Sequence, residues 1–419
     1  MESSSTSLDE KALLQRVGEA AIELQRLPLS VRERGIAVLT QTFQAEMNQV
    51  LEANTLDLET SRDLGVPGIL LNWLKLTPDR LQQVIPLLNR LLSSPTPKLS
   101  SGYGLTQAST LVHRLPIGVI ALIYEALPEL ALILAAMCIK TGNGLLLRGG
   151  AETSHSNAAI ASLIQRSLTQ AKLPADAIIA LAADPNHPLD NLLAHPESLD
   201  LVIPYGRTSL VDRVVKLSQV PVVQTCIGNC YLFWSHTGSV DSVESVILTS
   251  HRGHPEAVNA VEKILIPSNL QRPLLTLLWD NLEEKGFEIQ LDQELCDEFP
   301  EFRPFDPKSW GKPSFQKVLA FKLVADLPQA ITWINTHSSG HADCIVTDSY
   351  KETQQFLQGV KSSTVFVNQS PEFSRLHSSP SGTVAFCMGK FGGARHGVID
   401  LNSLLMEQHV FQGEALVSR

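Results

Sequence analysis

Apolar residues recur every three or four positions through the first part of the chain, and this spacing predicts helices between residues 8 and 95. Pro28 ends the first of these helices. Another is predicted to begin at Pro78, because proline suits the first helical position and Thr77 can cap the helix. Residues 92–104 are rich in serine, proline and glycine, so we expect an exposed linker there.

After this linker, short apolar runs alternate with segments of helical spacing. Strands are predicted at residues 115–126, 144–150, 177–183, 199–206, 220–234, 318–324 and 343–348. Helices are predicted between them, among others at residues 129–142, 151–171 and 207–219. This alternation predicts an α/β fold in which helices cover both faces of a parallel sheet.

Two of the predicted strand-to-helix junctions combine glycine with arginine. Arg148 precedes Gly149 and Gly150 at one junction, and Gly206 precedes Arg207 at the other. Free backbone N–H groups and the helix dipole favour an anion at such a place, and a guanidinium suits a phosphate such as the 2′-phosphate of NADP. A plain tight turn would also place glycine there, and the chain has neither GxGxxG nor a P-loop motif.

Histidine and cysteine provide no clear site. The histidine pairs of residues 250–256 and 336–341 lack a third ligand at a matching spacing, so we predict no metal site. Cys226 and Cys230 lie in an apolar segment without a histidine that could act as a base. We interpret both as core residues and keep nucleophilic catalysis by Cys226 as the alternative.

Composition narrows the class of protein. A length of 419 residues suggests two or three domains, and 44% hydrophobic residues provide a large core. The net charge of −10 argues against nucleic acid or an anionic membrane as the main partner. The longest apolar tract, residues 115–139, is interrupted by charged residues and proline, so we expect a buried strand and helix in place of a membrane span.

The number of cysteines and the first residues of the chain indicate the cellular compartment. Six cysteines in a chain of this length are too few for a disulfide scaffold, which favours a reducing compartment. Residues 1–17 have neither the basic start nor the apolar stretch of a signal peptide. We therefore expect a cytoplasmic protein.

Distinctive stretches run along most of the chain. They are EANTLDLE (52–59), LKLTPDRL (74–81), RLPIGVIALIYEALPE (114–129), IKTGNGLLLRGGAETSHSN (139–157), DLVIPYGR (200–207), RVVKLSQVPVV (213–223), AVNAVEKILIP (257–267), INTHSSGHADCIVT (334–347) and VFVNQS (365–370). Together they resemble gamma-glutamyl phosphate reductase, also called glutamate-5-semialdehyde dehydrogenase, of the aldehyde dehydrogenase superfamily.

The resemblance implies an aldehyde-dehydrogenase-like fold with two doubly wound α/β domains and a small β oligomerisation arm. The implied domains are an NADP-binding-type domain of residues 1–96 and 117–229, a catalytic-type domain of residues 230–403, and an arm of residues 97–116 and 404–419. An arm of this kind implies a homodimer or a homotetramer.

The resemblance also implies a reaction and its mechanism. The family uses NADPH to reduce L-glutamate 5-phosphate to L-glutamate 5-semialdehyde, with release of phosphate, in proline biosynthesis. A cysteine thiolate attacks the acyl phosphate, and hydride then reduces the thioester. An asparagine side chain and a backbone N–H stabilise the oxyanion.

This chain departs from the family pattern where the chemistry takes place. The nucleophilic cysteine falls at Val258, and the oxyanion asparagine falls at Glu129. The acidic residue that orients the nicotinamide ribose aligns with Pro313. Near the superfamily's general base the chain has Gln224 and Thr225, neither of which is a useful base at neutral pH. We therefore predict that the family reaction is lost or strongly impaired, and we name no catalytic residue.

Some of the other positions differ from the family pattern, and others match it. Tyr205 and Glu372 stand where the family has arginines, whereas the segment that begins at Arg148 matches the family. With the second glycine–arginine junction included, the predicted cofactor-binding residues are Arg148, Gly149, Glu152, Gly206 and Thr208.

Three hypotheses follow. The chain is an active reductase of the family type, an enzyme whose chemistry has moved to a residue such as Cys226, or a degenerate member that binds a partner. The partner in the third case would be a true reductase or glutamate 5-kinase of proline biosynthesis. Changes at the nucleophile, the oxyanion donor and the ribose-holding acid together favour the third hypothesis.

Overall fold

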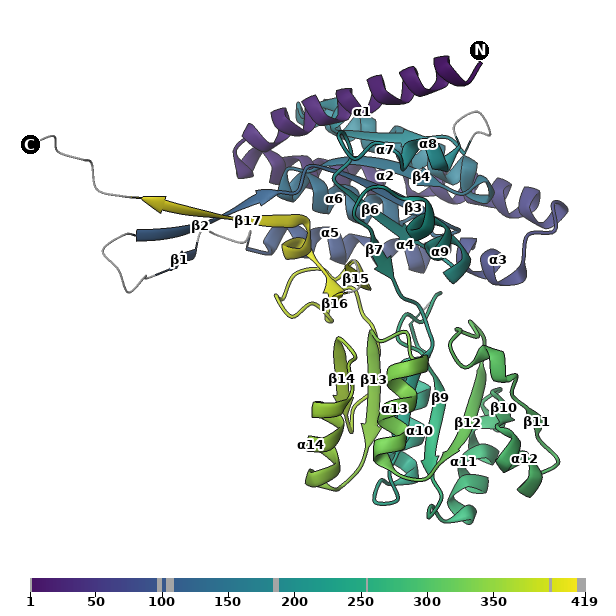
Figure 1. Ribbon diagram of the computed structural model, residues 1–419. Helices are drawn as coiled ribbons and strands as arrows, with labels where there is room; N and C mark the ends of the chain where they lie inside the picture. The colour runs from purple at the N-terminus through teal and green to yellow at the C-terminus, as the bar shows by residue number, and fades with distance from the viewer. Residues whose placement is uncertain are drawn as a thin grey trace, which may run out of the picture.

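The computed structural model describes residues 2–95, 100–102, 109–183, 188–253, 255–391 and 394–412. The predicted oligomerisation arm lies partly outside these residues, and so does His254 of the first histidine pair. The described residues form an α/β structure built on four β-sheets (Figure 1). Within this part of the chain, none of the helices combines the length and the apolar character that a membrane span requires.

A four-stranded parallel sheet forms the first layer, in the order β5-β4-β3-β6. Its strands are β3 (Val119–Tyr124), β4 (Gly144–Gly149), β5 (Ile178–Leu181) and β6 (Leu201–Tyr205). The helices around it are α1 (Glu2–Arg26), α2 (Leu29–Asp63), α3 (Gly68–Leu74), α4 (Pro78–Gln82), α5 (Val84–Ser93), α6 (Leu130–Thr141), α7 (Ser154–Ala171), α8 (Leu189–Leu192) and α9 (Thr208–Leu217).

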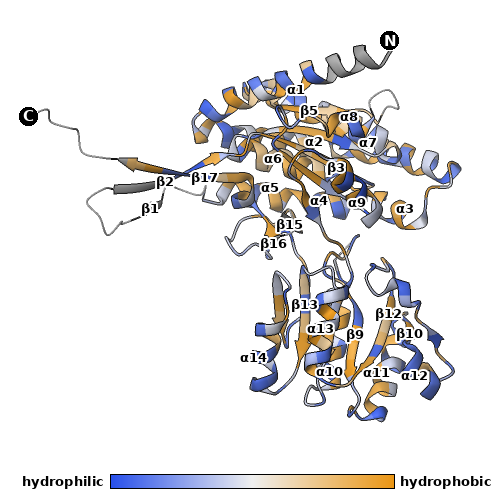
Figure 2. Cartoon of the chain, viewed as in Figure 1, coloured by the Kyte–Doolittle hydropathy of each residue, from blue (hydrophilic) through white to orange (hydrophobic). Residues whose placement is uncertain are grey.

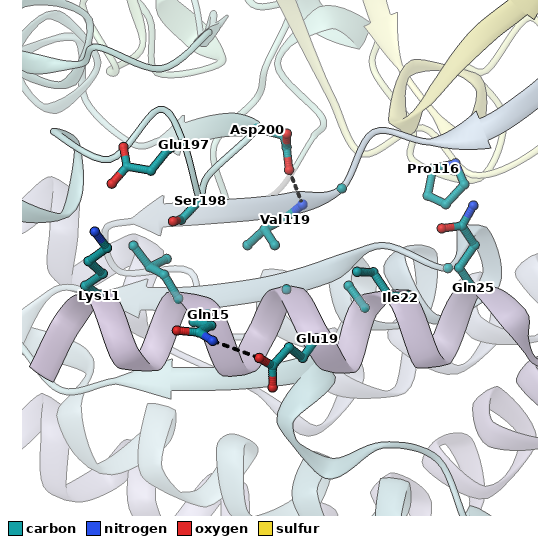
Figure 3. A pocket seen from close by; sticks show the side chains of 15 residues that line it. Lys11, Gln15, Glu19, Ile22, Gln25, Pro116, Val119, Glu197, Ser198 and Asp200 are labelled. Carbon is teal, nitrogen blue, oxygen red and sulfur yellow. Dashed lines mark hydrogen bonds between the residues drawn. The ribbon is translucent and has the colours of Figure 1, made fainter.

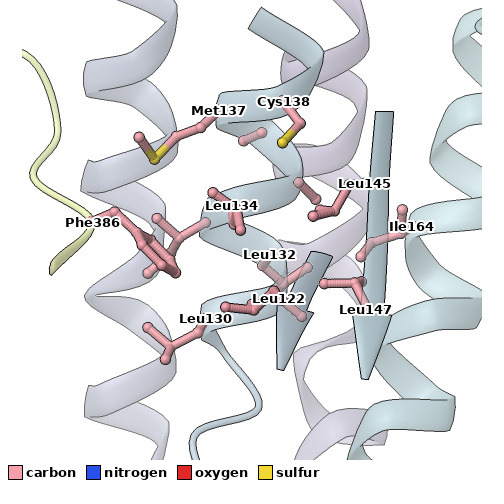
Figure 4. Close-up of a cluster of buried hydrophobic side chains, with 14 of the residues drawn as sticks. Leu122, Leu130, Leu132, Leu134, Met137, Cys138, Leu145, Leu147, Ile164 and Phe386 are labelled. Carbon is pink, nitrogen blue, oxygen red and sulfur yellow. The ribbon is translucent and has the colours of Figure 1, made fainter. Parts of the chain in front are cut away.

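Alternate residues of β3 point to opposite faces of this sheet. Ile120 and Leu122 pack with α2, α6 and α7, whereas Ala121 and Ile123 pack with α1, α8 and α9. Figure 4 shows the first of these cores, where apolar side chains of α6 meet Leu122 and the strand β4. Every residue of α6 is buried, so the apolar tract of residues 115–139 is a buried strand and helix, as predicted.

A seven-stranded parallel sheet forms the second α/β unit, in the order β11-β10-β12-β9-β8-β13-β14. Its strands are β8 (Cys230–Trp234), β9 (Val261–Pro267), β10 (Glu288–Leu291), β11 (Arg303–Pro304), β12 (Val318–Val324), β13 (Ala342–Val346) and β14 (Thr364–Val367). The helices α10 (Val240–Ser250) and α11 (Arg272–Glu284) pack on one face, and α13 (Leu327–His337) and α14 (Tyr350–Gly359) on the other. Figure 2 shows hydrophobic central strands and hydrophilic outer surfaces on α14 and α12 (Gln293–Glu298).

Two small antiparallel sheets complete the fold. One joins β7 (Val223–Thr225), β15 (Cys387–Phe391) and β16 (Ala394–Ile399). The other joins β1 (Ser100–Gly102), β2 (Ser109–Pro116) and β17 (Leu405–Gln412), and it extends away from the rest of the chain (Figure 1). The first small sheet takes strands from both sides of the predicted boundary at residue 230, and the domain division itself remains a prediction.

The structure confirms the predicted α/β class and refines two details. The predicted strand at residues 220–234 is interrupted, because Gly228 and Asn229 adopt positive φ angles of 68° and 58° and divide it into β7 and β8. The predicted linker begins later than expected, since α5 continues to Ser93 and the Ser94 side chain is buried.

Candidate functional site

Residues 226–229 connect β7 to β8, the first strand of the second α/β unit. A cavity of about 270 Å³ lies there, lined by the first turn of α9, by β7 and by loops of the second unit. Such crevices at the carboxyl ends of parallel strands are the usual ligand sites of α/β proteins. The cavity brings together many residues that the sequence indicated, namely Gly206, Thr208, Gln224, Thr225, Cys226 and Pro313.

A second cavity of about 470 Å³ adjoins the same segment. Gly228 lines this cavity, whereas its neighbours Ile227 and Asn229 line the first one, so the segment separates the two spaces. The rest of the second lining comes from α3, from residues 251–260 before β9, from Glu262 of β9 and from residues 315–317.

Val258 lies in the loop that precedes β9, two residues after Glu256 of the second cavity. Its side chain is buried against Phe373, Ala385 and Met388. Its carbonyl oxygen accepts a hydrogen bond from the Gly228 N–H at 2.8 Å and lies 3.0 Å from Nε2 of His341. Val258, which the resemblance aligns with the family nucleophile, is thus held firmly in place and carries only hydrocarbon.

Three residues that line the two cavities have strained backbone. Asn229, Ala257 and Phe315 adopt positive φ angles of 58°, 39° and 54°, and Ala126, which lines neither cavity, adopts one of 53°. Such angles are uncommon outside glycine and are outliers for bulky residues, and they persist mainly at functional sites. The backbone geometry of a site is therefore present here although the reactive side chains differ.

The carboxylates of Glu262, which is buried, and Glu152, which is partly buried, hold three of these strained residues. Glu262 accepts backbone N–H bonds from Asn229 at 3.0 Å and from Phe315 at 3.2 Å, and Glu152 accepts one from Ala126 at 2.9 Å. Glu262 also pairs with Lys263 at 3.1 Å, and both side chains are almost fully buried. Glu262 has no signal in the sequence beyond a Glu-Lys pair inside an apolar strand, and it was therefore not predicted.

Glu129 stands at the N-terminus of α6 and is paired with Arg80 of α4. Arg80 Nε donates to Glu129 Oε1 at 2.8 Å, and Arg80 Nη2 contacts the same oxygen. Arg80 also donates to the carbonyls of Trp73 and Lys75, at 2.6 and 2.9 Å. Glu129, which the resemblance aligns with the oxyanion donor of the family, is therefore a carboxylate in a largely buried ion pair.

A second buried network joins Tyr205, Glu256 and Arg375. The Tyr205 hydroxyl donates to Glu256 Oε1 at 2.9 Å, and Arg375 Nη2 donates to the same oxygen at 2.5 Å. Burial alone would raise the pKa of Glu256, but the charge and hydrogen bond of Arg375, the charge of Arg80 and the hydrogen bond of Tyr205 together lower this pKa below its usual value. The opposing charge of Glu256 raises the pKa of Arg375 against the effect of burial. Both groups are therefore charged at neutral pH.

Cys226 lines the first cavity but is not activated. Its side chain is 8% exposed, and burial raises the pKa of the thiol to about 11, against a small opposing effect of Lys390. Cys230 Sγ lies 3.3 Å from His341 Nε2, yet burial raises the pKa of this thiol far above its usual value and lowers the pKa of His341 to about 4. Both thiols are therefore protonated at neutral pH, which is unsuited to nucleophilic attack.

We expect Cys226 to resist alkylation. In a time course with iodoacetamide at pH 8, the half-buried Cys296 should react before Cys226, because the other cysteines among the described residues are buried. Peptide mass spectrometry would locate the label, and Cys296→Ser should remove most of the early modification. Labelling of Cys226 ahead of Cys296 would contradict this expectation and revive the nucleophile hypothesis.

The predicted cofactor residues at the end of β4 line neither of these two cavities. Arg148 and Gly149 end β4, and Glu152 lies in the 3₁₀ turn that follows. A Cβ atom on Gly149 would lie 1.8 Å from Asn157 Nδ2, so this glycine makes room for a side chain of the chain itself. Burial raises the pKa of Glu152.

The second glycine–arginine junction is also occupied by a side chain. Glu125 accepts from the Arg207 backbone N–H at 3.0 Å and from the Arg207 guanidinium at 3.0 and 3.2 Å. A Cβ atom on Gly206 would lie 2.8 Å from Glu125, so the glycine permits this approach. Thr208 remains beside the first cavity at the start of α9.

A third cavity, of about 430 Å³, lies along α1 beside β3 (Figure 3). Gln15 donates to Glu19 at 2.9 Å, and Val119 donates its backbone N–H to Asp200 at 2.7 Å. None of the predicted catalytic or cofactor residues lines it. Over the residues described, no group of three or more histidine, cysteine, aspartate and glutamate side chains could hold a metal ion.

Comparison with known proteins places these observations in context. No protein-family model matches the chain. Gamma-glutamyl phosphate reductase 2 of Synechocystis sp. is 41% identical over 421 residues, which cover 98% of this chain and 99% of that protein. The crystal structure of gamma-glutamyl phosphate reductase from Thermotoga maritima superposes with a TM-score of 0.87 at 25% identity, covering 98% of this chain and all of that one. An acetylating aldehyde dehydrogenase from Geobacillus thermoglucosidasius has the same fold, with a TM-score of 0.70 at 12% identity over 100% of this chain and 99% of that one.

Proposed function

Because the chain belongs to the gamma-glutamyl phosphate reductase family, we propose that it is a non-catalytic member that retains a nicotinamide-nucleotide cleft. The observation that carries the proposal is Val258, which stands at the position of the family nucleophile. An aliphatic side chain offers no thiolate, so the acyl-enzyme step has no route.

Buried ion pairs at the altered positions support a function other than the family reaction. A buried charge that has lost its partner costs about 3–5 kcal/mol, so unselected changes would tend to leave unpaired charges and an unstable fold. Here Glu129 has Arg80 as its partner, and Glu256 has Arg375. The altered residues thus form a compensated structure, which supports a stable protein maintained for a purpose other than the family reaction.

The alternative is a reductase whose chemistry has moved to Cys226. Its thiol lies in the cavity, but its pKa of about 11 leaves it protonated, and its sulfur lies 3.6 Å from the carbonyl oxygen of Gln224, which is no base. These two observations favour the non-catalytic proposal.

The residues of the first cavity suit a nicotinamide cofactor in part. Hydroxyl groups of Thr208, Ser338 and Ser339 and the ammonium of Lys390 surround it, and the N-terminus of α9 adds a partial positive charge. These groups would hold phosphates by hydrogen bonds and charge, and Arg148, Gly149 and Glu152 would hold the adenosine part. When bound, the cofactor supplies hydride. Glu125 already accepts from the N-cap of α9, so we propose that binding is weak.

The proposal extends to assembly and location. The sheet of β1, β2 and β17 would serve as the oligomerisation arm of a homodimer or homotetramer, because it extends from the body of the molecule (Figure 1). The partner would be an enzyme of proline biosynthesis, such as a catalytically complete reductase or glutamate 5-kinase, and the location would be the cytoplasm.

Calorimetry with NADPH and NADH tests the cofactor part of the proposal. We expect weak NADPH binding, and Arg148→Ala should reduce NADPH affinity by about tenfold or more, since a hydrogen bond to a charged group contributes about 1.5–3 kcal/mol. NADH affinity should change less, because NADH lacks the 2′-phosphate. Arg16→Ala, on the surface of α1, is the control. Equal losses for both cofactors would contradict the role of Arg148.

A further inference from the structure

Tyr205, Glu256 and Arg375 come from three separate parts of the chain. Tyr205 ends β6, Glu256 precedes β9, and Arg375 lies in the loop between β14 and β15. The side chain of Glu256 is 2% exposed and that of Arg375 is 17% exposed. The fold therefore places a carboxylate and a guanidinium together in a largely dry environment, close to Val258.

The hydrogen bonds of this trio converge on a single oxygen. Glu256 Oε1 accepts from both Tyr205 and Arg375, and Arg375 Nη2 also lies 3.0 Å from the Tyr205 hydroxyl. Within the described part of the chain, Glu256 Oε2 and Arg375 Nε are buried and form no hydrogen bond. The guanidinium lies over the rings of Tyr205 and Phe373, at 5.9 and 5.8 Å from their centroids. Arg375 is thus oriented by two aromatic rings and still has donor capacity.

Glu256 has a second role in the geometry, because it also lines the cavity of about 470 Å³. Glu256 lines the cavity on one side, and on the other side its carboxylate accepts a hydrogen bond from Arg375. A guanidinium is the side chain best suited to bind a carboxylate or a phosphate. In this protein the guanidinium of Arg375 instead binds the carboxylate of Glu256.

We propose that Glu256 is a built-in counter-anion that excludes anionic ligands from the cavity beside Val258. An incoming carboxylate or phosphate would meet the negative charge of Glu256 and find the guanidinium of Arg375 already engaged. Lys317 and the carboxylate of Glu262 also line the cavity and are opposite in sign, so the cavity would favour uncharged or cationic ligands. This inference concerns ligand binding alone, and it holds whether or not the chain turns over a substrate.

Titration calorimetry with inorganic phosphate, at constant ionic strength adjusted with sodium chloride, tests the inference. Wild-type protein should show no saturable phosphate binding in the millimolar range. Glu256→Ala should bind phosphate at least about tenfold more tightly, a factor that corresponds to about 1.4 kcal/mol. Glu256→Gln, which keeps the shape but loses the charge, should show a smaller gain.

Two further variants identify the group responsible. Glu256→Ala combined with Arg375→Gln should lose the gain, because the guanidinium is no longer present. Glu33→Gln removes the carboxylate from another ion pair with a buried cation, Lys140, away from the cavity, and it should show no gain. If Glu256→Ala does not fold in the sodium chloride buffer, the phosphate affinity of Glu256→Gln can be compared with that of wild type instead. Three results would each overturn the inference. The first is wild-type protein that binds phosphate as tightly as Glu256→Ala. The others are no gain in phosphate affinity in Glu256→Ala or Glu256→Gln, and a gain that persists when Arg375→Gln is added.

Discussion

Purified protein should give no measurable oxidation of glutamate 5-semialdehyde when it is supplied with NADP and phosphate. Removing the nucleophile of an enzyme whose groups act as a unit lowers kcat by about a millionfold, and Val258 has no sulfur to replace it. Glu129 adds a negative charge where an oxyanion would form, and the loss of one oxyanion donor alone costs about 2.7–4 kcal/mol. An absorbance assay for NADPH formation is the measurement.

Restoring single residues should not restore the reaction. Val258→Cys alone should remain inactive, because the site would still lack the asparagine that helps to stabilise the oxyanion and would have the carboxylate of Glu129 in its place. Glu129→Asn and Pro313→Glu should both be needed with it before a rate appears. Adding Glu256→Ala to this triple variant should lower KM for the anionic substrate. Robust turnover by the unmutated chain, abolished by Cys226→Ala, would show that the chemistry has moved and that the non-catalytic proposal is wrong.

Arg80→Gln should lower the free energy of unfolding by about 3–5 kcal/mol, the usual cost of leaving a buried charge unpaired. The side chains of Arg80 and Glu129 are 12% and 9% exposed, and Arg80 also satisfies the carbonyls of Trp73 and Lys75. Urea denaturation followed by circular dichroism is the measurement. A second variant, Arg80→Gln with Glu129→Gln, should recover part of the loss, because the unpaired carboxylate is gone.

Arg272→Gln is the matched control for this stability prediction. Arg272 pairs with Glu298 at 2.9 Å, but the two side chains are 29% and 44% exposed, and exposed pairs contribute about 0–1 kcal/mol. An Arg80 variant as stable as this control would mean that Glu129 tolerates the loss of its partner. It would also weaken the argument that the altered site is a compensated structure.

The fold class could be predicted from the sequence because it depends on the local periodicity of apolar residues. Alternating apolar runs and helical spacing predict parallel sheets without any knowledge of long-range contacts. The break between β7 and β8 was missed because Asn229 is held at positive φ by the distant carboxylate of Glu262. Local propensity cannot report such a tertiary constraint.

The candidate site was predictable only in part, for a similar reason. The resemblance to a family identified Val258, Glu129 and Pro313 as departures at reactive positions. It did not indicate Arg375, because a lone arginine in a loop has no pattern of its own. Only the fold brings that arginine to Glu256, which is over a hundred residues earlier in the chain.

The small sheet of β1, β2 and β17 has a consequence for the order in which the chain can fold during synthesis. Leu405 of β17 lies opposite Pro116 of β2, so the paired strands are separated by about 290 residues. The four-stranded sheet is complete by residue 205, long before the ribosome has made β17. Throughout that interval one edge of β2 has no neighbour, and exposed strand edges promote association between chains. The growing chain therefore remains open to aggregation, or to capture by another copy, at this edge until its last strand emerges.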